Sequence, residues 1–418
     1  MTGPSIADPG LADAGRDRIE WADAQMPVLR SIRERFAAER PLEGVRVAAA
    51  LHVTAETANL LRALAAGGAQ LSLAAANPLS TQDDVAASLV AHHGVDVRAV
   101  HGEDARSYAR HLSEMVASEP DVTLDDGADL VTGLHAERPA AAARMLGALE
   151  ETTTGLLRLR VMEAAGRLAC PVFAVNEARA ERAYNDRFGT GQSTLDGILR
   201  ATNLLLAGQT FVVLGYGWTG QGVALRARGA GASVIVCEVD PLRALEARME
   251  GFEVMPAIEA AARGDVFVTV TGNREVLTRA HFERMKDNAV LANAGHFDVE
   301  ISLPDLASLA IAAPRRVRPL VDQYDLGNRR LNLLARGRVV NLAAAEGHPA
   351  AVMDVSFAIQ ALTCEHLVAR RGELTPAVHP VPDAIDRETA RLKLVALGVG
   401  IDELTEAQER YLRGWAPE

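Results

Sequence analysis

The feature that most constrains this chain is a glycine-rich turn at residues 215–220, Gly-Tyr-Gly-Trp-Thr-Gly. It follows a continuous apolar segment at 210–214 and precedes a helical pattern, which is the context that a dinucleotide-binding G-x-G-x-x-G turn requires. Gly215, Gly217 and Gly220 allow a tight turn and a close approach of the backbone to a pyrophosphate, while the helix N-terminus supplies amide donors. The alternative is a purely structural glycine turn in another α/β fold.

Glu238 ends the next apolar strand, where an acid accepts hydrogen bonds from the adenosine ribose of a dinucleotide. A carboxylate at this position repels a 2′-phosphate, so the sequence favours NAD over NADP, although the nearby Arg243 weakens that preference. Further strands are predicted at 265–273, 289–296 and 338–349. Together these segments predict a complete Rossmann domain that binds NAD.

The first half of the chain shows the same alternation of apolar strands and helical patterns. Strands are predicted at 45–53, 70–77, 95–102 and 121–127, with a helix at about 55–66. Short strands separated by helices indicate a parallel sheet covered on both faces. Polar side chains follow the strand ends at His52, Asn77, Asp125 and Asp126. Ligands bind at the carboxyl ends of such strands, so this half is predicted to hold the substrate.

We therefore predict an α/β chain with two Rossmann-like, doubly wound parallel-sheet domains and a short helical C-terminal segment. Residues 1–186 and 350–382 are expected to form the substrate-binding domain, and residues 187–349 the NAD-binding Rossmann domain. Residues 383–418 are expected to form a helical tail of two helices, with a turn at 398–400.

Composition narrows the classes of function. The formal net charge of −12 argues against nucleic acid as a partner. No apolar run looks long enough to span a bilayer, and the N-terminus lacks the pattern of a signal peptide, so we expect a cytoplasmic protein. The three cysteines show no paired spacing, which fits reduced thiols and gives no metal site. Lysine occurs only at Lys286 and Lys393, so a catalytic lysine has two candidate positions.

Seven motifs, taken together, resemble the S-adenosyl-L-homocysteine hydrolase family. They occur in the family's order and nearly its spacing, from about residue 10 to about residue 415: LHVTAET (51–57), STQD (80–83), LDDGADL (124–130), EETTTG (150–155), GYGWTGQG (215–222), GHFDVEI (295–301) and VNLAAAEGHP (340–349). Several of these motifs are long and peculiar to that family.

The resemblance implies a redox-assisted reaction. In the family, bound NAD⁺ oxidises the ribose 3′-hydroxyl of an adenosyl substrate, a base removes the acidified 4′ proton, and the 5′ substituent leaves. Water then adds, and the retained NADH reduces the ketone, so NAD stays bound throughout turnover. The family is usually homotetrameric, so the resemblance implies a homotetramer or a homodimer.

The resemblance also assigns roles to individual residues. His52 and Asp126 match the acid–base pair near the 5′ position, and Glu151 matches a carboxylate that contacts the ribose. Thr152, Thr153 and Thr154 match a run that contacts NAD, and His296 belongs to a hinge-linked gate. Four further residues match substrate contacts of the family: Thr54, Glu56, His348 and Met353. Asn273 and Asn341 match cofactor contacts, and His348 also matches a position near the cofactor. Without the resemblance, His52 could be a satisfied histidine at a strand end, and the threonines could be helix caps.

The chain departs from the family's pattern at the active site. Glu181 stands where the family has a lysine, and Asn185-Asp186 stands where the family has Asp-Asn. Crowded carboxylates at 151, 181 and 186 could raise the pKa of Glu181 enough for it to act as a base, so Glu181, Asn185 and Asp186 are candidate catalytic residues. The alternative is a set of solvated helix charges. Glu346 replaces an apolar residue, and the family's Lys- and Tyr-containing tail is replaced by 410–418, so NAD binding or the subunit contact could differ.

These departures favour a divergent member of the family, in which the 5′-hydroxyl of an adenine nucleoside leaves and no water adds. Such a 4′,5′-dehydratase, a lyase, would suit a specialised antibiotic-type pathway. Hydroxide needs stronger general-acid help than a thiolate, which fits a changed proton-transfer group. The alternatives are an ordinary hydrolase that gives adenosine and homocysteine, and an NAD-binding regulatory protein without turnover.

Overall fold

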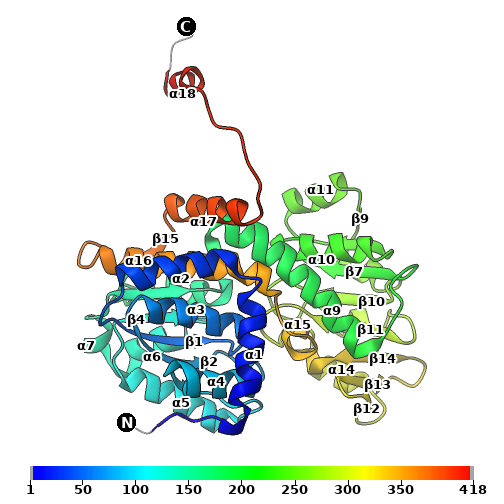
Figure 1. Ribbon diagram of the computed structural model, residues 1–418. Helices are drawn as coiled ribbons and strands as arrows, with labels where there is room; N and C mark the ends of the chain where they lie inside the picture. The colour runs from blue at the N-terminus through cyan, green and yellow to red at the C-terminus, as the bar shows by residue number, and fades with distance from the viewer. Residues whose placement is uncertain (1–2, 415–418) are drawn as a thin grey trace.

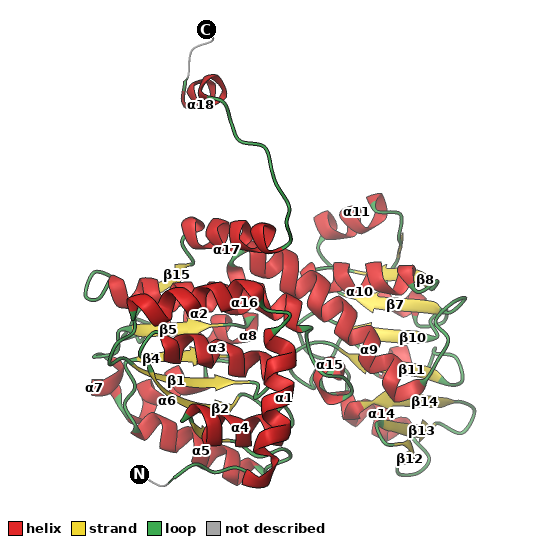
Figure 2. Cartoon of the chain, in the orientation of Figure 1, coloured by secondary structure: helices red, strands yellow, loops and turns green. Residues whose placement is uncertain are grey.

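The computed structural model describes residues 3–414, which form two α/β lobes lying side by side (Figures 1 and 2). The first lobe is built on a seven-stranded, all-parallel sheet in the order β15-β6-β5-β4-β1-β2-β3. Its strands are β1 (Arg46–Leu51), β2 (Gln70–Ala75), β3 (Asp96–Arg98), β4 (Val122–Asp125), β5 (Gly147–Glu150), β6 (Val172–Ala174) and β15 (Val378–Pro380).

Strand β1 shows why this sheet is covered on both faces. Val47, Ala49 and Leu51 pack into one hydrophobic cluster, whereas Ala48 and Ala50 pack into another on the opposite face. Successive side chains of a strand point to opposite faces, so a continuous apolar run needs helices on both sides.

Helices cover the two faces of the first sheet. One face carries α1 (Ala12–Asp23), α2 (Pro27–Glu39), α3 (Ala55–Ala66), α4 (Asp83–His93) and α16 (Ala350–Ala369). The other carries α5 (Ala105–Ala117), α6 (Asp129–Glu137), α7 (Pro139–Ala142) and α8 (Thr153–Ala164). The C-terminal segment therefore returns to the first lobe, where β15 pairs with β6 and α17 (Asp383–Ala396) packs on α16.

The second lobe contains an eight-stranded sheet in the order β12-β13-β14-β11-β10-β7-β8-β9. Its strands are β7 (Thr210–Leu214), β8 (Ser233–Cys237), β9 (Glu253–Val254), β10 (Val266–Thr269), β11 (Ala289–Asn293), β12 (Arg315–Arg318), β13 (Val321–Asp325) and β14 (Arg330–Leu334). All neighbours are parallel except β12-β13 and β13-β14. The prediction of two doubly wound parallel-sheet lobes is confirmed, and the antiparallel edge is an addition that the sequence analysis missed.

The helices of the second lobe also lie on two faces. One face carries α9 (Gly191–Thr202), α10 (Trp218–Gly229), α11 (Pro241–Met249) and α15 (Val340–Ala343), and the other carries α12 (Ala257–Ala260), α13 (Arg279–Phe282) and α14 (Leu303–Leu309). The predicted strand at 338–349 is wrong: it contains α15, and only Val339 forms a bridge, with Asn293. A short apolar run does not distinguish a buried strand from a buried helix.

A π-helix, η3 (Glu181–Thr190), runs directly into α9 and connects the lobes. It packs closely on α10, since a Cβ atom on Gly222 would lie 1.8 Å from the carbonyl oxygen of Arg187. At its other end, the Asp386 carboxylate of α17 accepts the amide hydrogens of Arg179 and Ala180 at 2.7 and 2.9 Å. Contacts with both lobes therefore fix the backbone of η3.

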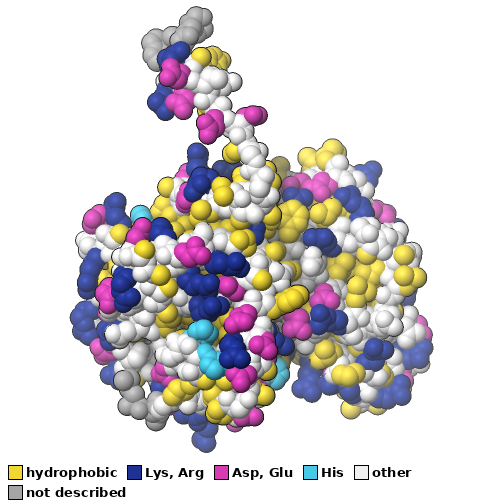
Figure 3. Space-filling model, in the orientation of Figure 1, with side chains coloured by type: hydrophobic (Ala, Val, Ile, Leu, Met, Phe, Trp, Pro, Cys, Tyr) yellow, Lys and Arg dark blue, Asp and Glu magenta, His cyan; other side chains and the backbone are white. Residues whose placement is uncertain are grey.

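Helix α16 is long and apolar enough for a membrane span by length and composition alone, but 72% of its apolar window is buried inside the protein. It packs against α2, α3 and α17. Acidic and basic side chains are interspersed over the visible surface (Figure 3). Beyond α17 the chain extends away from the lobes to α18 (Glu406–Arg413), while 415–418 lie outside the described residues (Figure 1).

Candidate active site

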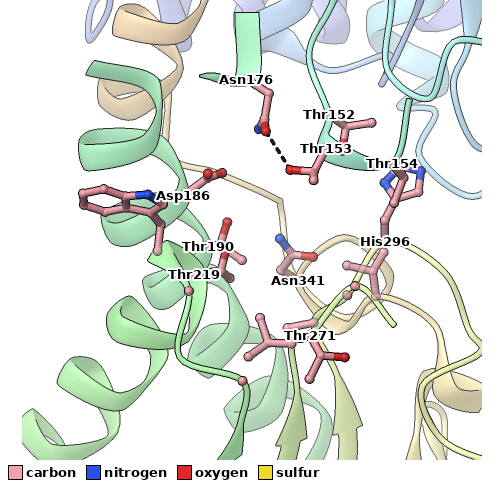
Figure 4. A pocket seen from close by; sticks show the side chains of 18 of the residues that line it. Thr152, Thr153, Thr154, Asn176, Asp186, Thr190, Thr219, Thr271, His296 and Asn341 are labelled. Atoms are coloured by element: carbon pink, nitrogen blue, oxygen red, sulfur yellow. Dashed lines mark hydrogen bonds between the residues drawn. The ribbon is translucent and has the colours of Figure 1, made fainter. Parts of the chain in front are cut away.

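A cavity of about 1360 Å³ lies between the lobes, at the carboxyl ends of strands from both sheets. All the predicted site residues line it except Gly220. Figure 4 shows Thr152, Thr153 and Thr154 of the first lobe facing Thr271, His296 and Asn341 of the second. The topology therefore brings together residues that are far apart in the sequence.

The glycine turn forms a cradle at the cofactor end of the cavity. Gly215 has φ +107°, and a Cβ atom there would lie 2.9 Å from the carbonyl oxygen of Val270. Gly217 opens the N-terminus of α10 and lines the cavity. A Cβ atom on Gly220 would lie 2.1 Å from the carbonyl oxygen of Gly215, so Gly220 allows helix and strand to pack closely. This arrangement fits a bound pyrophosphate.

Glu238 stabilises the same turn. Its Oε2 accepts the Tyr216 amide hydrogen at 2.7 Å, and its Oε1 accepts the amide hydrogens of Val239 and Asp240 at 2.6 and 3.0 Å. A carboxylate has about four acceptor positions, so Glu238 can also accept ribose hydroxyl hydrogens. The residues present therefore fit NAD.

Four side-chain oxygens of cavity-lining residues are buried without a hydrogen-bond partner: Thr154 Oγ1, Asn185 Oδ1, Tyr216 Oη and Asn341 Oδ1. Neighbouring polar groups do have hydrogen-bond partners. The Thr153 hydroxyl donates to Asn176 Oδ1 at 2.7 Å (Figure 4), and the backbone amide of Asn273 donates to Thr271 Oγ1 at 3.0 Å. Buried polar atoms usually have partners, so these unpaired oxygens indicate that a ligand contacts the cavity wall.

His52 and Asp126 form the first proton-transfer group. His52 Nε2 lies 3.0 Å from Asp126 Oδ2, and His52 Nδ1 lies 2.7 Å from Ser80 Oγ. The Ser80 hydroxyl donates to the Asn77 carbonyl oxygen at 2.9 Å, so it accepts from Nδ1–H. Burial opposes ionisation of Asp126, but His52 outweighs it and lowers the pKa of Asp126 to about 2. Asp126 is therefore an ionised carboxylate in contact with the His52 imidazole, and such a pair suits proton transfer.

His348 lies beside this pair and is neutral. Its Nε2 is 2.9 Å from Thr190 Oγ1, and burial followed by the charge of His52 lowers its pKa to about 4. His296 reaches across from the second lobe, since a Cβ atom on Gly127 would lie 3.8 Å from His296 Nε2. Thr54, Glu56 and Met353 line the first-lobe side of the cavity, where burial raises the pKa of Glu56.

A second group of titratable residues surrounds the position at which the family has a lysine. Glu151, Glu181 and Asp186 all line the cavity. Burial and then the charge of Asp186 raise the pKa of Glu181 to about 8, and burial raises that of Asp186 to about 7. Burial and then the charge of Glu181 raise the pKa of Glu151 well above its ordinary value. Glu181 is buried, so the alternative of a solvated helix charge is wrong for this residue.

Neither lysine replaces the missing one. Lys286 pairs with Asp265 at 2.7 Å in the second lobe. Lys393 pairs with the buried Asp354 at 2.8 Å beneath α16, and neither lysine lines the cavity. Glu346 does line it, but its exposed carboxylate pairs with Arg200 at 3.2 Å.

Sequence reasoning missed Ser356 and Gln360, which complete the acidic group. They follow Met353 on α16 at spacings of three and seven residues, which places them on the same helix face. Both are buried polar residues on a mostly apolar helix and share a face with Met353, and this is the signal that could have identified them.

Two family models match the chain: "S-adenosyl-L-homocysteine hydrolase" at residues 4–142 and its "NAD binding domain" at residues 186–347. The chain is 58% identical over 411 residues to an adenosylhomocysteinase from Aquifex aeolicus, covering 98% of each chain. It is 53% identical to an S-inosyl-L-homocysteine hydrolase from Methanosarcina mazei, covering 97% of this chain and 98% of that protein. The NAD prediction is confirmed. These relatives are named as hydrolases, and nothing in their names supports dehydration, a lyase or an antibiotic pathway.

Proposed function

The chain belongs to the S-adenosyl-L-homocysteine hydrolase family, and we propose that it uses bound NAD to hydrolyse S-adenosyl-L-homocysteine or S-inosyl-L-homocysteine. The observation that carries this proposal is the presence of two separate proton-transfer groups in the cavity that also contains the glycine turn. The reaction needs proton transfer at the ribose ring, from the 3′-hydroxyl and from the 4′ carbon, and at the 5′ position, so one proton-transfer group at each end of the sugar would meet that need.

Bound NAD supplies reversible hydride transfer at the ribose 3′ carbon. Within the proposal, Glu151 and Glu181 accept the proton of the 3′-hydroxyl. His52, held by Asp126, donates a proton at the 5′ leaving group and then takes one from the incoming water. Glu56 and Thr54 hold the base, where a carboxylate can accept either the amino hydrogens of adenine or the N1 hydrogen of hypoxanthine.

A second candidate function is dehydration of an adenine nucleoside to a 4′,5′-unsaturated product. One observation favours it: the buried acid Glu181, with a raised pKa, replaces the lysine that the resemblance leads us to expect. The names of the relatives favour hydrolysis, so hydrolysis is our first proposal.

One experiment separates the two candidates. The holoenzyme is incubated with S-adenosyl-L-homocysteine, S-inosyl-L-homocysteine and adenosine, and both free thiol and nucleoside mass are measured. Hydrolysis predicts thiol release, whereas dehydration predicts the loss of one water from adenosine. Failure to produce thiol, unsaturated nucleoside or bound NADH would support a regulatory protein instead. His52→Asn should abolish turnover, while His92→Asn, a change on the exposed end of α4, is the matched control.

We also propose the domain limits and the assembly. Residues 1–186 with 350–382 would form the substrate-binding domain, 187–349 the NAD-binding domain, and 383–418 a C-terminal tail. Helix α18 is short and exposes Tyr411 and Leu412, and isolated helices of this length are unstable in water. A second subunit that covers α18 in a cytoplasmic homodimer or homotetramer would stabilise it, and light scattering on the full chain tests this.

A further inference from the structure

A buried serine joins the two acids at the lysine-equivalent end of the cavity. The Ser356 hydroxyl oxygen lies 2.8 Å from Glu151 Oε1 and also hydrogen-bonds Glu181 Oε2. Asn185 Nδ2 donates to the same serine oxygen at 2.8 Å and to Glu181 Oε1. Gln360 Nε2 donates to Glu151 Oε2. Every carboxyl oxygen of the pair therefore has a partner.

The hydrogen-bond pattern requires at least one proton on the two acids. A serine hydroxyl donates a single hydrogen and accepts at its lone pairs. Ser356 accepts from Asn185, and it can donate to only one of the two carboxyl groups. The other carboxyl group must donate to Ser356, and it can do so only when it is protonated. Glu151 and Glu181 thus hold at least one proton between them, and the serine oxygen lies between the two carboxyl groups.

We propose that Glu151, Ser356 and Glu181 form a one-proton relay that performs the base chemistry at the ribose hydroxyl in place of the lysine. Glu181 gives its proton to the serine oxygen while the serine gives its own to Glu151, and the reverse exchange restores the first arrangement. The exchange leaves one carboxylate ionised, and this carboxylate accepts the substrate hydroxyl proton. The acid pair changes from charge −1 to 0, whereas a lysine changes from 0 to +1, so both store one proton. Ser356 is a positioning residue in this relay.

The charges around the pair support this proton count. Asp186 on η3 and Asp386 on α17 act on Glu181, and Asp126 beyond β4 acts on Glu151. All three are acidic and, together with burial, raise the pKa values of the pair. Arg182 acts on Asp186 rather than on the pair. This environment opposes simultaneous ionisation of both acids, so the pair retains a proton near neutral pH.

The inference rests on the proposed function, so its test includes a measurement that needs no substrate. Infrared spectra of the holoenzyme in H₂O and D₂O detect the carbonyl band of a protonated carboxyl group. We expect Glu181→Gln to remove one such band at neutral pH, and Ser356→Ala to shift the pH at which the band disappears. Thr363→Val is the matched control. It also removes a buried hydroxyl from α16, but the Thr363 hydroxyl has no hydrogen-bond partner.

The second measurement is the rate at which NADH forms on mixing the holoenzyme with adenosine, across pH. The relay predicts a rate that rises and then falls with pH in the wild type. In Ser356→Ala we expect a rate roughly tenfold to a hundredfold lower and a pH profile with one limb lost. An unchanged profile and an unchanged infrared band in Ser356→Ala would overturn the relay while leaving the hydrolase proposal intact. Infrared evidence for the shared proton, without NADH formation in the wild type, would instead count against the proposed function.

Discussion

Replacing Glu181 by glutamine should stabilise the protein increasingly as pH rises. The folded chain raises the pKa of Glu181 from 4.5 to about 8, chiefly through burial. Below the unfolded-state pKa of 4.5, Glu181 is protonated in both the folded and the unfolded state, so its ionisation does not change the stability of the protein. As pH rises towards the folded value, the unfolded state ionises while the folded state stays protonated, so stability is lost. The full loss is roughly 5 kcal/mol, at about 1.4 kcal/mol for each pH unit.

Glutamine avoids this loss and preserves the contacts. Its side-chain oxygen can accept from Asn185, and its amide can donate to Ser356, as the protonated acid does. Between about pH 5.5 and about pH 8 the advantage of the variant should grow by roughly 3 kcal/mol. For a chain of 418 residues, that corresponds to a growth of roughly 3 to 4 °C in the difference between unfolding midpoints.

The assay is thermal unfolding of the holoenzyme at both pH values. Glu34→Gln, a change at an exposed glutamate of α2, controls for the loss of a surface charge. If the midpoints of Glu181→Gln and the wild type differ equally at the two pH values, the argument that Glu181 is held protonated by burial is refuted. The same substitution should reduce NADH formation, so stability and activity should change in opposite directions.

Three further outcomes follow from the packing and ion pairs. Gly222→Ala places a methyl group against the Arg187 carbonyl and should destabilise the protein by about 1–3 kcal/mol, measured by urea unfolding; an unchanged urea midpoint would contradict the close contact. Lys393→Met leaves Asp354 buried without its cation. Near neutral pH it should lower the free energy of unfolding by about 3–5 kcal/mol, measured by urea unfolding, and an unchanged free energy of unfolding would show that this ion pair is dispensable. Glu238→Ala removes the acceptor that holds the glycine turn and should weaken NAD binding roughly tenfold to a hundredfold by calorimetry, with an unchanged Kd as the contrary result.

Local sequence patterns were sufficient to predict the two sheets and the cofactor turn. The residues at 210–220 predict a strand, a turn and the start of a helix from local sequence alone. Gly215 and Gly220 have the close backbone contacts that such a turn requires. The continuous apolar character of β1 likewise predicts burial on both faces, and its side chains pack into two clusters.

Other features depend on contacts that no local pattern encodes. The antiparallel strands β12 to β14 form an edge whose pairing is decided by the rest of the sheet. The bond between Ser356 and Glu181 joins positions 175 residues apart, and the bond from Ser356 to Glu151 spans 205 residues. The sequence shows that Glu181 replaces a lysine, but only the fold shows that Glu181 is buried beside a second acid.

The π-helix η3 has an evolutionary consequence. Its backbone is held by the Asp386 carboxylate at one end and by the close contact between Gly222 and Arg187 at the other. None of these contacts uses the side chains at positions 181, 185 and 186, where the chain departs from its family. A lineage can therefore exchange those three side chains, and with them the proton chemistry at the ribose, while the architecture of both lobes is inherited unchanged.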